Sequence, residues 1–200
     1  MSDAAADLVD EKVETRSQRL KRATRDLHEA LDQRMMQGDL FSDRTRYALF
    51  LAMQWRFHAE IAALYGAPDL IAIAPDLPSR RKLEEIENDI SDVGAAVPAA
   101  DLRPVDAGDR ASGLGWLYVA EGSSLGAAFL LKEAEKLGLG AEFGARHLAA
   151  HPEGRGLHWR RFTQALDAAE LTEDEEARAE ASAVAAFRRV REIAEETLRG

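Results

Sequence analysis

Apolar residues recur every three to four positions along most of this chain, whereas runs that alternate β-branched and polar residues are almost missing. The first such stripe ends before Gly38, a helix-stopping residue, and contains Leu20, Ala23, Leu27, Ala30 and Leu31. Thr172 and Glu175 have the spacing of a capping box. It opens a last helix whose inward residues are Ala183, Ala186, Phe187, Val190 and Ile193. This pattern predicts an all-α fold.

Caps and breaks divide the chain into segments. We expect helices over about 13–36, 42–66, 79–93, 110–137 and 157–169, with Ser42 and Ser79 as N-caps. Prolines interrupt the chain between 66 and 79, residues 94–109 form a loop, and a shorter element lies at 143–151. The 200 residues fit one domain over 13–200, and the alanine- and aspartate-rich residues 1–12 are predicted to be disordered.

Composition excludes several classes of function. The chain has 36 acidic and 26 basic residues and no basic block, which argues against nucleic acid as a partner. It has no cysteine, which excludes disulfides, thiolate-bound heme, iron–sulfur clusters and cysteine nucleophiles. No export signal is present, and the most apolar stretch, 113–131, is interrupted by Glu121 and two serines. We therefore expect a cytoplasmic protein without a membrane span.

The helix expected at 110–137 is unusual because it contains Gly122 and Gly126. A glycine inside a helix costs roughly 1 kcal/mol relative to alanine, so an interaction elsewhere should offset the loss. The two glycines lie four apart, on one face, where a flat group could approach the backbone. Ser123 and Ser124 add hydroxyls that suit a kinked helix beside a polar pocket. Close packing of another helix is an equally open interpretation.

Two histidines, His28 and His58, lie on or beside apolar helical stripes, where an imidazole is either a core residue or a metal ligand. Heme chemistry needs one imidazole on the iron, an open position for O₂ and cations for the propionates. Lys21 lies two turns before His28 on the same face, and no similar cation precedes His58. Either histidine remains a candidate, with a slight preference for His28. The remaining three histidines, at 147, 151 and 158, are expected at the surface.

Three segments together resemble the bacterial heme oxygenases, particularly those that supply biliverdin to bacteriophytochromes. They are LKRATRDLHEALD at 20–32, GWLYVAEGSSLG at 115–126, and the stretch from Leu171 to Phe187. The likeness runs in order over about 17–198. It implies one helical domain in which heme is sandwiched between a proximal helix and a kinked distal helix.

The resemblance also assigns roles to single residues. His28 matches the proximal iron ligand, and Lys21 matches a lysine that binds a heme propionate. Gly122 and Gly126 match the distal glycines whose backbone lies against bound O₂. Two aromatic residues, Tyr118 and Phe187, match groups that line the pocket.

The chain departs from the family pattern in two places. Ser123 stands where many members have an aspartate that organises water above the iron, so Ser123 joins the glycines as a catalytic candidate. A late basic pair that seats the heme is matched only in part, by Arg160 and its neighbour Arg161.

The reaction implied by this resemblance uses O₂ and electrons to convert heme, as both cofactor and substrate, to biliverdin, CO and ferrous iron. The electron donor would be a ferredoxin or a flavoprotein reductase, and a bacteriophytochrome would be a possible acceptor of the bilin. An acidic ferredoxin would dock on a basic patch, for which Arg22, Arg25, Arg160 and Arg161 are candidates.

Two other functions compete with this interpretation. A heme carrier or sensor with the same fold would bind heme without turning it over, and Ser123 in place of the aspartate is the feature that favours it. A helical enzyme acting on a non-heme small molecule, like the thiaminase-type proteins, would need a catalytic cysteine or a carboxylate cluster, and neither pattern is found.

Overall fold

The structure is a computed structural model that describes residues 14–199; the segment predicted to be disordered, 1–12, lies outside that range. The described residues form α-helices and short 3-10 helices without a β-strand, which confirms the all-α prediction. In chain order the elements are α1 (Arg16–Gln37), α2 (Arg44–Glu60), η1 (Ala62–Gly66), α3 (Pro68–Ile73), η2 (Leu77–Arg80), α4 (Leu83–Asp92), α5 (Arg110–Glu135), η3 (Arg146–Leu148), α6 (Arg155–Ala168) and α7 (Glu173–Arg199).

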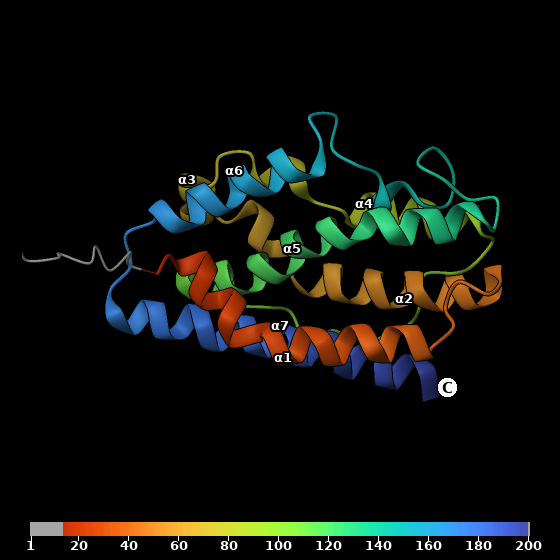
Figure 1. Ribbon diagram of the computed structural model, residues 1–200, viewed down its shortest axis with the longest axis horizontal. Coiled ribbons are helices and arrows are strands. Elements are labelled where there is room, and N and C mark those ends of the chain that lie inside the picture. Colours follow the sequence, from red (N-terminus) through yellow and green to blue (C-terminus); the bar gives the residue numbers. More distant parts are fainter. Residues whose placement is uncertain (1–13, 200) are drawn as a thin grey trace, which may run out of the picture.

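Helix α7 packs against three of the other long helices, α1, α2 and α5. Figure 1 shows α1 and α7 running side by side along one edge, with α4 and α6 at the opposite edge. Towards their C-terminal ends, α1 and α5 lie far apart in this view, and α2 passes between them. The two helices that carry the predicted site are therefore joined mainly through α7.

Capping residues explain where the long helices begin. Thr15 and Gln18 form a capping box at α1, so this helix starts at Arg16, close to the expected residue 13. Asp43, one residue after the predicted Ser42, caps α2 by accepting from the amide of Arg46. The expected box at Thr172 and Glu175 opens α7 and is confirmed.

The proline-containing region differs from the prediction. Pro68 occupies the first turn of the short helix α3, a position that tolerates its missing N–H, so a helix forms where only a break was expected. Ser79 does not cap α4, because it lies in η2 and its hydroxyl donates to the carbonyl of Asp76. Helix α4 starts later, at Leu83.

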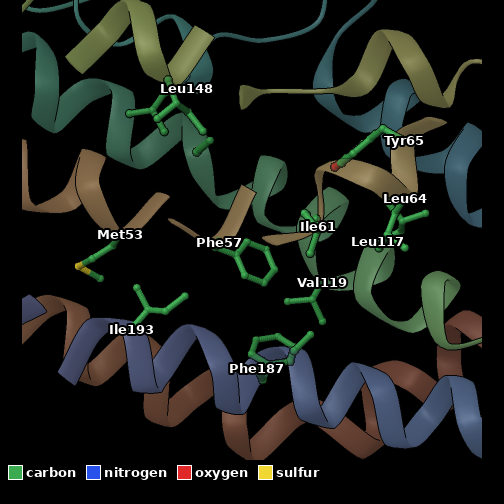
Figure 2. Close-up of a cluster of buried hydrophobic side chains, with 14 of the residues drawn as sticks. Met53, Phe57, Ile61, Leu64, Tyr65, Leu117, Val119, Leu148, Phe187 and Ile193 are labelled. Carbon is green, nitrogen blue, oxygen red and sulfur yellow. The ribbon is translucent and has the colours of Figure 1, made fainter. Parts of the chain in front are cut away.

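The core lies between α2, α5 and α7 and consists mainly of large aliphatic and aromatic side chains. Figure 2 shows part of it, with Met53 and Phe57 of α2 facing Ile193 and Phe187 of α7. A buried ion pair crosses the same layer, where Arg189 donates from Nη2 to Glu60 at 2.6 Å. Both side chains are almost fully buried, so the pair links α2 to α7 within the core.

Helix α5 packs so closely on α7 that the contact requires a glycine. A Cβ at Gly115 would lie 2.2 Å from the carbonyl oxygen of Ala179, far below any normal contact. By length and composition α5 is also the one helix within 14–199 that could cross a membrane, a test that core helices pass too. Its N-terminal half is buried in the core, as the prediction of a buried helix requires.

Candidate functional site

His28 lies on α1 with an exposed side chain, of which 60% is accessible. Its Nδ1 atom lies 3.0 Å from Oδ2 of Asp32, one helical turn further on. A carboxylate at this distance favours the tautomer with the proton on Nδ1, which leaves the lone pair of Nε2 available. His28 therefore has the arrangement of a histidine prepared to bind a metal through Nε2.

Phe187 of α7 connects this histidine to the core. The ring centroids of His28 and Phe187 are 5.6 Å apart in an edge-to-face arrangement. Figure 2 shows Val119 of α5 pointing toward Phe187, which is itself 8% exposed. The phenyl ring thus contacts the imidazole of α1 on one side and faces Val119 of α5 on the other.

Gly122 and Gly126 occupy one face of α5, and neither is needed for packing within the protein. A Cβ at Gly126 would meet no atom within 4 Å, and one at Gly122 would make ordinary contact, 3.5 Å, with Trp159. Gly115 on the same helix is the opposite case, because α7 fills the space beside it. Close packing of another helix therefore requires a glycine at Gly115 but not at the two predicted positions: Gly126 presents bare backbone to open space, and Gly122 lies beside Trp159 with room for a Cβ.

Large apolar side chains are exposed beside this face. Phe129 is 62% exposed and Leu125 is 43% exposed, and both lie within one turn of Gly126. On α1, Met36 is 79% exposed. Three of the five exposed large apolar residues of 14–199 therefore belong to the two helices of the predicted site, where an apolar ligand would cover them.

The predicted cations and Tyr118 lie around these helices. Lys21 of α1 and Arg160 of α6 are exposed, and neither has an ion-pair partner within 14–199. Tyr118 packs on Trp159 of α6, with ring centroids 5.6 Å apart. Burial, with a contribution from Asp167, raises the pKa of Tyr118 to about 12, so its hydroxyl stays protonated.

The opposite face of α5 borders a cavity of about 190 Å³. At 100° per residue, Ala120, Ser124 and Ala127 point away from the two glycines, and these residues line the cavity together with residues of α2, η3 and α6. The Ser123 hydroxyl donates to the carbonyl of Ala120 at 2.7 Å. Ser123 also lines the cavity, but it lies only about 60° from Gly126 and therefore stands between the two sides of α5, with its hydroxyl turned back onto the helix.

Four of the five histidines of the chain line this cavity, including His58 of α2. Burial, together with His147 and Lys82, lowers the pKa of His58 to about 3, so its imidazole is neutral. No residue of α1 lines the cavity, so His28 and His58 serve different spaces.

His147 is only 8% exposed, and its expected place at the surface is wrong. Its Nδ1 bonds to Oδ2 of Asp89 in α4 at 2.7 Å, while its buried Nε2 has no hydrogen-bond partner within 14–199. Burial alone would raise the pKa of Asp89, but the hydrogen bonds from His147 and from two backbone amides lower it instead. A charged carboxylate thus orients a buried imidazole toward the cavity.

A second buried network holds the residue that precedes Gly122. Glu121 accepts from the Tyr65 hydroxyl at 3.0 Å and from Arg80 at 2.9 Å, and Arg80 also donates to the carbonyl of His158 in α6. Burial raises the pKa of Glu121 although both donors counteract it. The sequence offered no local signal for Arg80 or Asp89, because their partners lie 41 and 58 residues away.

Comparisons with known proteins agree on one family. The model of the heme oxygenase family matches residues 14–196. The heme oxygenase PigA of Pseudomonas aeruginosa is 40% identical over 184 residues, which are 91% of this chain and 92% of that protein. The crystal structure of the NO- and CO-bound heme oxygenase of Neisseria meningitidis superposes with a TM-score of 0.87 at 37% identity, covering 92% of each chain. The matched range includes every predicted site residue.

Proposed function

Since this chain belongs to the heme oxygenase family and is an oxidoreductase that cleaves heme, we propose that α1 and α5 hold the heme between them. His28 binds the iron from one side, and the backbone at Gly122 and Gly126 faces it from the other. The products are biliverdin, CO and ferrous iron. The chain supplies this bilin to an acceptor such as a bacteriophytochrome, or releases the iron for use.

The observation that supports this arrangement best is the open glycine face of α5. A Cβ at Gly126 would contact nothing, although glycine costs the helix about 1 kcal/mol there. Met36, Leu125 and Phe129 expose apolar surface on the same two helices. A flat apolar ring between α1 and α5 would cover this surface and would need the bare backbone for its approach.

When bound, the heme supplies an iron that accepts electrons and binds O₂, while its own ring is the substrate. His28 would hold the iron through a single imidazole. Asp32 holds the proton on Nδ1 of His28, which keeps Nε2 directed to the iron. The glycines would leave room for a small ligand between the α5 backbone and the ring, because Gly126 has no Cβ and nothing else fills that space.

Protons for the reaction come from the cavity side of α5. The space beside Ser123 has a mixed lining with several polar side chains that can hold ordered water, among them the buried imidazoles of His58 and His147. Ser123 and Ser124 take the place of the aspartate that many family members have. Because Ser123 lies between the cavity side of α5 and its glycine face, water held there would pass protons around the helix toward Gly126.

Charged residues at the rim complete the site. Lys21 and Arg160 are exposed cations without ion-pair partners within 14–199, and they bind the two heme propionates. An electron donor, a ferredoxin or a flavoprotein reductase, docks near Arg22 and Arg25. These two arginines pair with Glu14 and Asp26 at exposed positions, where an acidic partner could compete for them.

The test is a titration with hemin, followed by addition of ascorbate under air and detection of bilin by its red absorption. We expect hemin binding and turnover for the wild type, and loss of turnover for His28→Ala with partial rescue by imidazole. The matched variant His58→Ala should keep the iron ligand and its spectrum. Loss of ligation in His58→Ala alone would reject the assignment, and stable heme without bilin would identify a carrier or sensor.

A further inference from the structure

Arg155, the first residue of α6, contacts the middle of α5 directly. Its Nη1 donates to the backbone carbonyl of Ser124 at 3.0 Å, and its Nη2 donates to the carbonyl of Leu148 in η3. Ser124 lies between Gly122 and Gly126. The guanidinium therefore connects the glycine segment of α5 to η3, which α4 holds through Asp89 and His147.

The glycine segment, defined as residues 122–130, packs against the core through Ala127 and Leu130, and its other residues lie outside the core. The cavity borders its inner face at Ser123, Ser124 and Ala127. Its outer face is open at Gly126 and exposes Phe129. A helix segment with few packing contacts depends on its remaining hydrogen bonds for its position.

Three backbone carbonyls in this part of α5 accept a side-chain donor in addition to the helical amide. In a regular helix the carbonyl of Ser124 accepts only the amide four residues later, but here it also accepts from Arg155. The carbonyls of Ala120 and Glu121 accept the hydroxyls of Ser123 and Ser124 in addition. Extra donors of this kind lengthen ladder bonds and bend helices, so the local direction of α5 is set by side chains.

The Arg155 side chain is bonded to the carbonyl oxygens of Ser124 and Leu148. It has no carboxylate partner within 14–199, and burial lowers its pKa. A partly buried guanidinium bonded to two carbonyl oxygens forms strong, directional hydrogen bonds. Arg160 lies exposed on the same helix, and its side chain makes no such hydrogen bond in the described part of the chain.

We propose that Arg155 is a positioning residue that fixes where the glycine segment stands over the bound heme and thereby fixes which meso carbon is oxidised. This inference rests on the proposed function. Arg155 itself does not touch the substrate. It acts through the Ser124 carbonyl, because a shift of that backbone moves both glycines relative to the ring.

The test compares Arg155→Met with Arg155→Lys, which keeps the charge and one donor to the carbonyl. The control is Lys136→Met, which removes an exposed cation paired only with Glu133 near the end of α5. Amide hydrogen exchange is measured by mass spectrometry on the heme-free and heme-loaded proteins. Biliverdin isomers are separated by chromatography after turnover.

In Arg155→Met we expect exchange in the glycine segment to become about tenfold faster, the effect of losing one charge-assisted hydrogen bond, while α2 and α7 stay unchanged. The product should become a mixture of isomers. Arg155→Lys should lie between wild type and Arg155→Met, and Lys136→Met should match wild type in both measurements.

Unchanged exchange, or an equal increase in all helices, would overturn the positioning role. A loosened segment that still yields the wild-type isomer would overturn the link to the meso carbon. Absence of heme binding in the wild type would reject the proposed function, yet the exchange result on the heme-free protein would still decide whether Arg155 holds the segment.

Discussion

Glycines on one helix serve opposite purposes in this protein. Gly115 is required because the backbone of α7 fills the position of its missing side chain, whereas Gly126 borders open space. Both positions look alike in the sequence, because each is a glycine inside an apolar helical pattern. What distinguishes them is whether another helix lies there, and only the fold shows that.

This difference predicts opposite effects of the same substitution. Gly126→Ala should stabilise the protein by about 1 kcal/mol, because alanine favours the helix and its Cβ meets nothing. Gly115→Ala should destabilise it by about 1–3 kcal/mol or more, because the backbone of Ala179 must move. Urea unfolding measures both. A destabilised Gly126→Ala would show that the face is not open.

The lowered pKa of His58 predicts how the free energy of unfolding depends on pH. Its pKa of about 3 in the folded protein lies below the value near 6.5 of an unfolded histidine, so unfolding takes up a proton between these values. The contribution of His58 is therefore fully present above pH 6.5 and is lost as pH falls toward 3. In that window we expect His58 to lower the free energy of unfolding by up to about 1.4 kcal/mol for each unit by which the pH falls.

His58→Leu should abolish this part of the acid sensitivity and keep the stability at pH 7 within about 1 kcal/mol of wild type, since the unpaired buried nitrogen is removed with the ring. His151→Leu, at a half-exposed position, is the control and should retain the wild-type slope. Urea unfolding between pH 7 and 4 gives both slopes. Equal slopes for His58→Leu and wild type would refute the explanation.

At the scale of elements, the sequence predicted most helices because caps and periodicity are local. The ends of α1, α5 and α7 lie within a few residues of the prediction. The start of α4 was wrong because Ser79 bonds within η2 instead of capping a helix. His147 was wrong for a different reason: its partner, Asp89, is distant in sequence, so nothing near His147 indicates burial.

The hydrogen bond from His147 of η3 to Asp89 of α4 gives a prediction for Asp89. Its folded pKa is lowered, so its stabilising effect is present above the unfolded value near 3.9 and is lost as pH falls through the folded pKa. Asp89→Asn should cost about 1–3 kcal/mol at pH 7, because a buried charge-assisted bond to His147 is lost. The difference from wild type should shrink below about pH 4.

Chemical denaturation at pH 7 and pH 3.5 tests this, with Glu84→Gln on the exposed side of α4 as control. That substitution removes one carboxylate from the same helix without touching η3, so it should cost less than about 1 kcal/mol, the contribution of an acidic residue in the first helical turn. An Asp89→Asn protein as stable as Glu84→Gln at pH 7 would show that the pair does not hold α4 to η3.

On the scale of the whole molecule, α7 supports the two walls of the proposed heme site, which are helices α1 and α5. Helices α1 and α5 each pack against α7, and they diverge toward their C-terminal ends (Figure 1). The sequence predicted each wall separately, from His28 on one helix and the glycines on another. That the walls share one support, and that a cavity lies behind the second wall, follows only from packing between distant segments.

Two walls joined mainly through α7 should be stabilised when a ligand bridges them. Hemin at 100 times its dissociation constant adds about 2.7 kcal/mol, which for a chain of this size corresponds to a rise in Tm of roughly 5–11 °C. Differential scanning calorimetry measures the rise. Iron-free protoporphyrin keeps the flat ring and the propionates but offers no bond to His28, so at the same concentration as hemin it should raise Tm less. His28→Ala should reduce the hemin effect to that of protoporphyrin, because both then lack the bond to α1. If His28→Ala gained as much from hemin as the wild type does, the iron would not be held from α1, and the two-walled site would have to be abandoned.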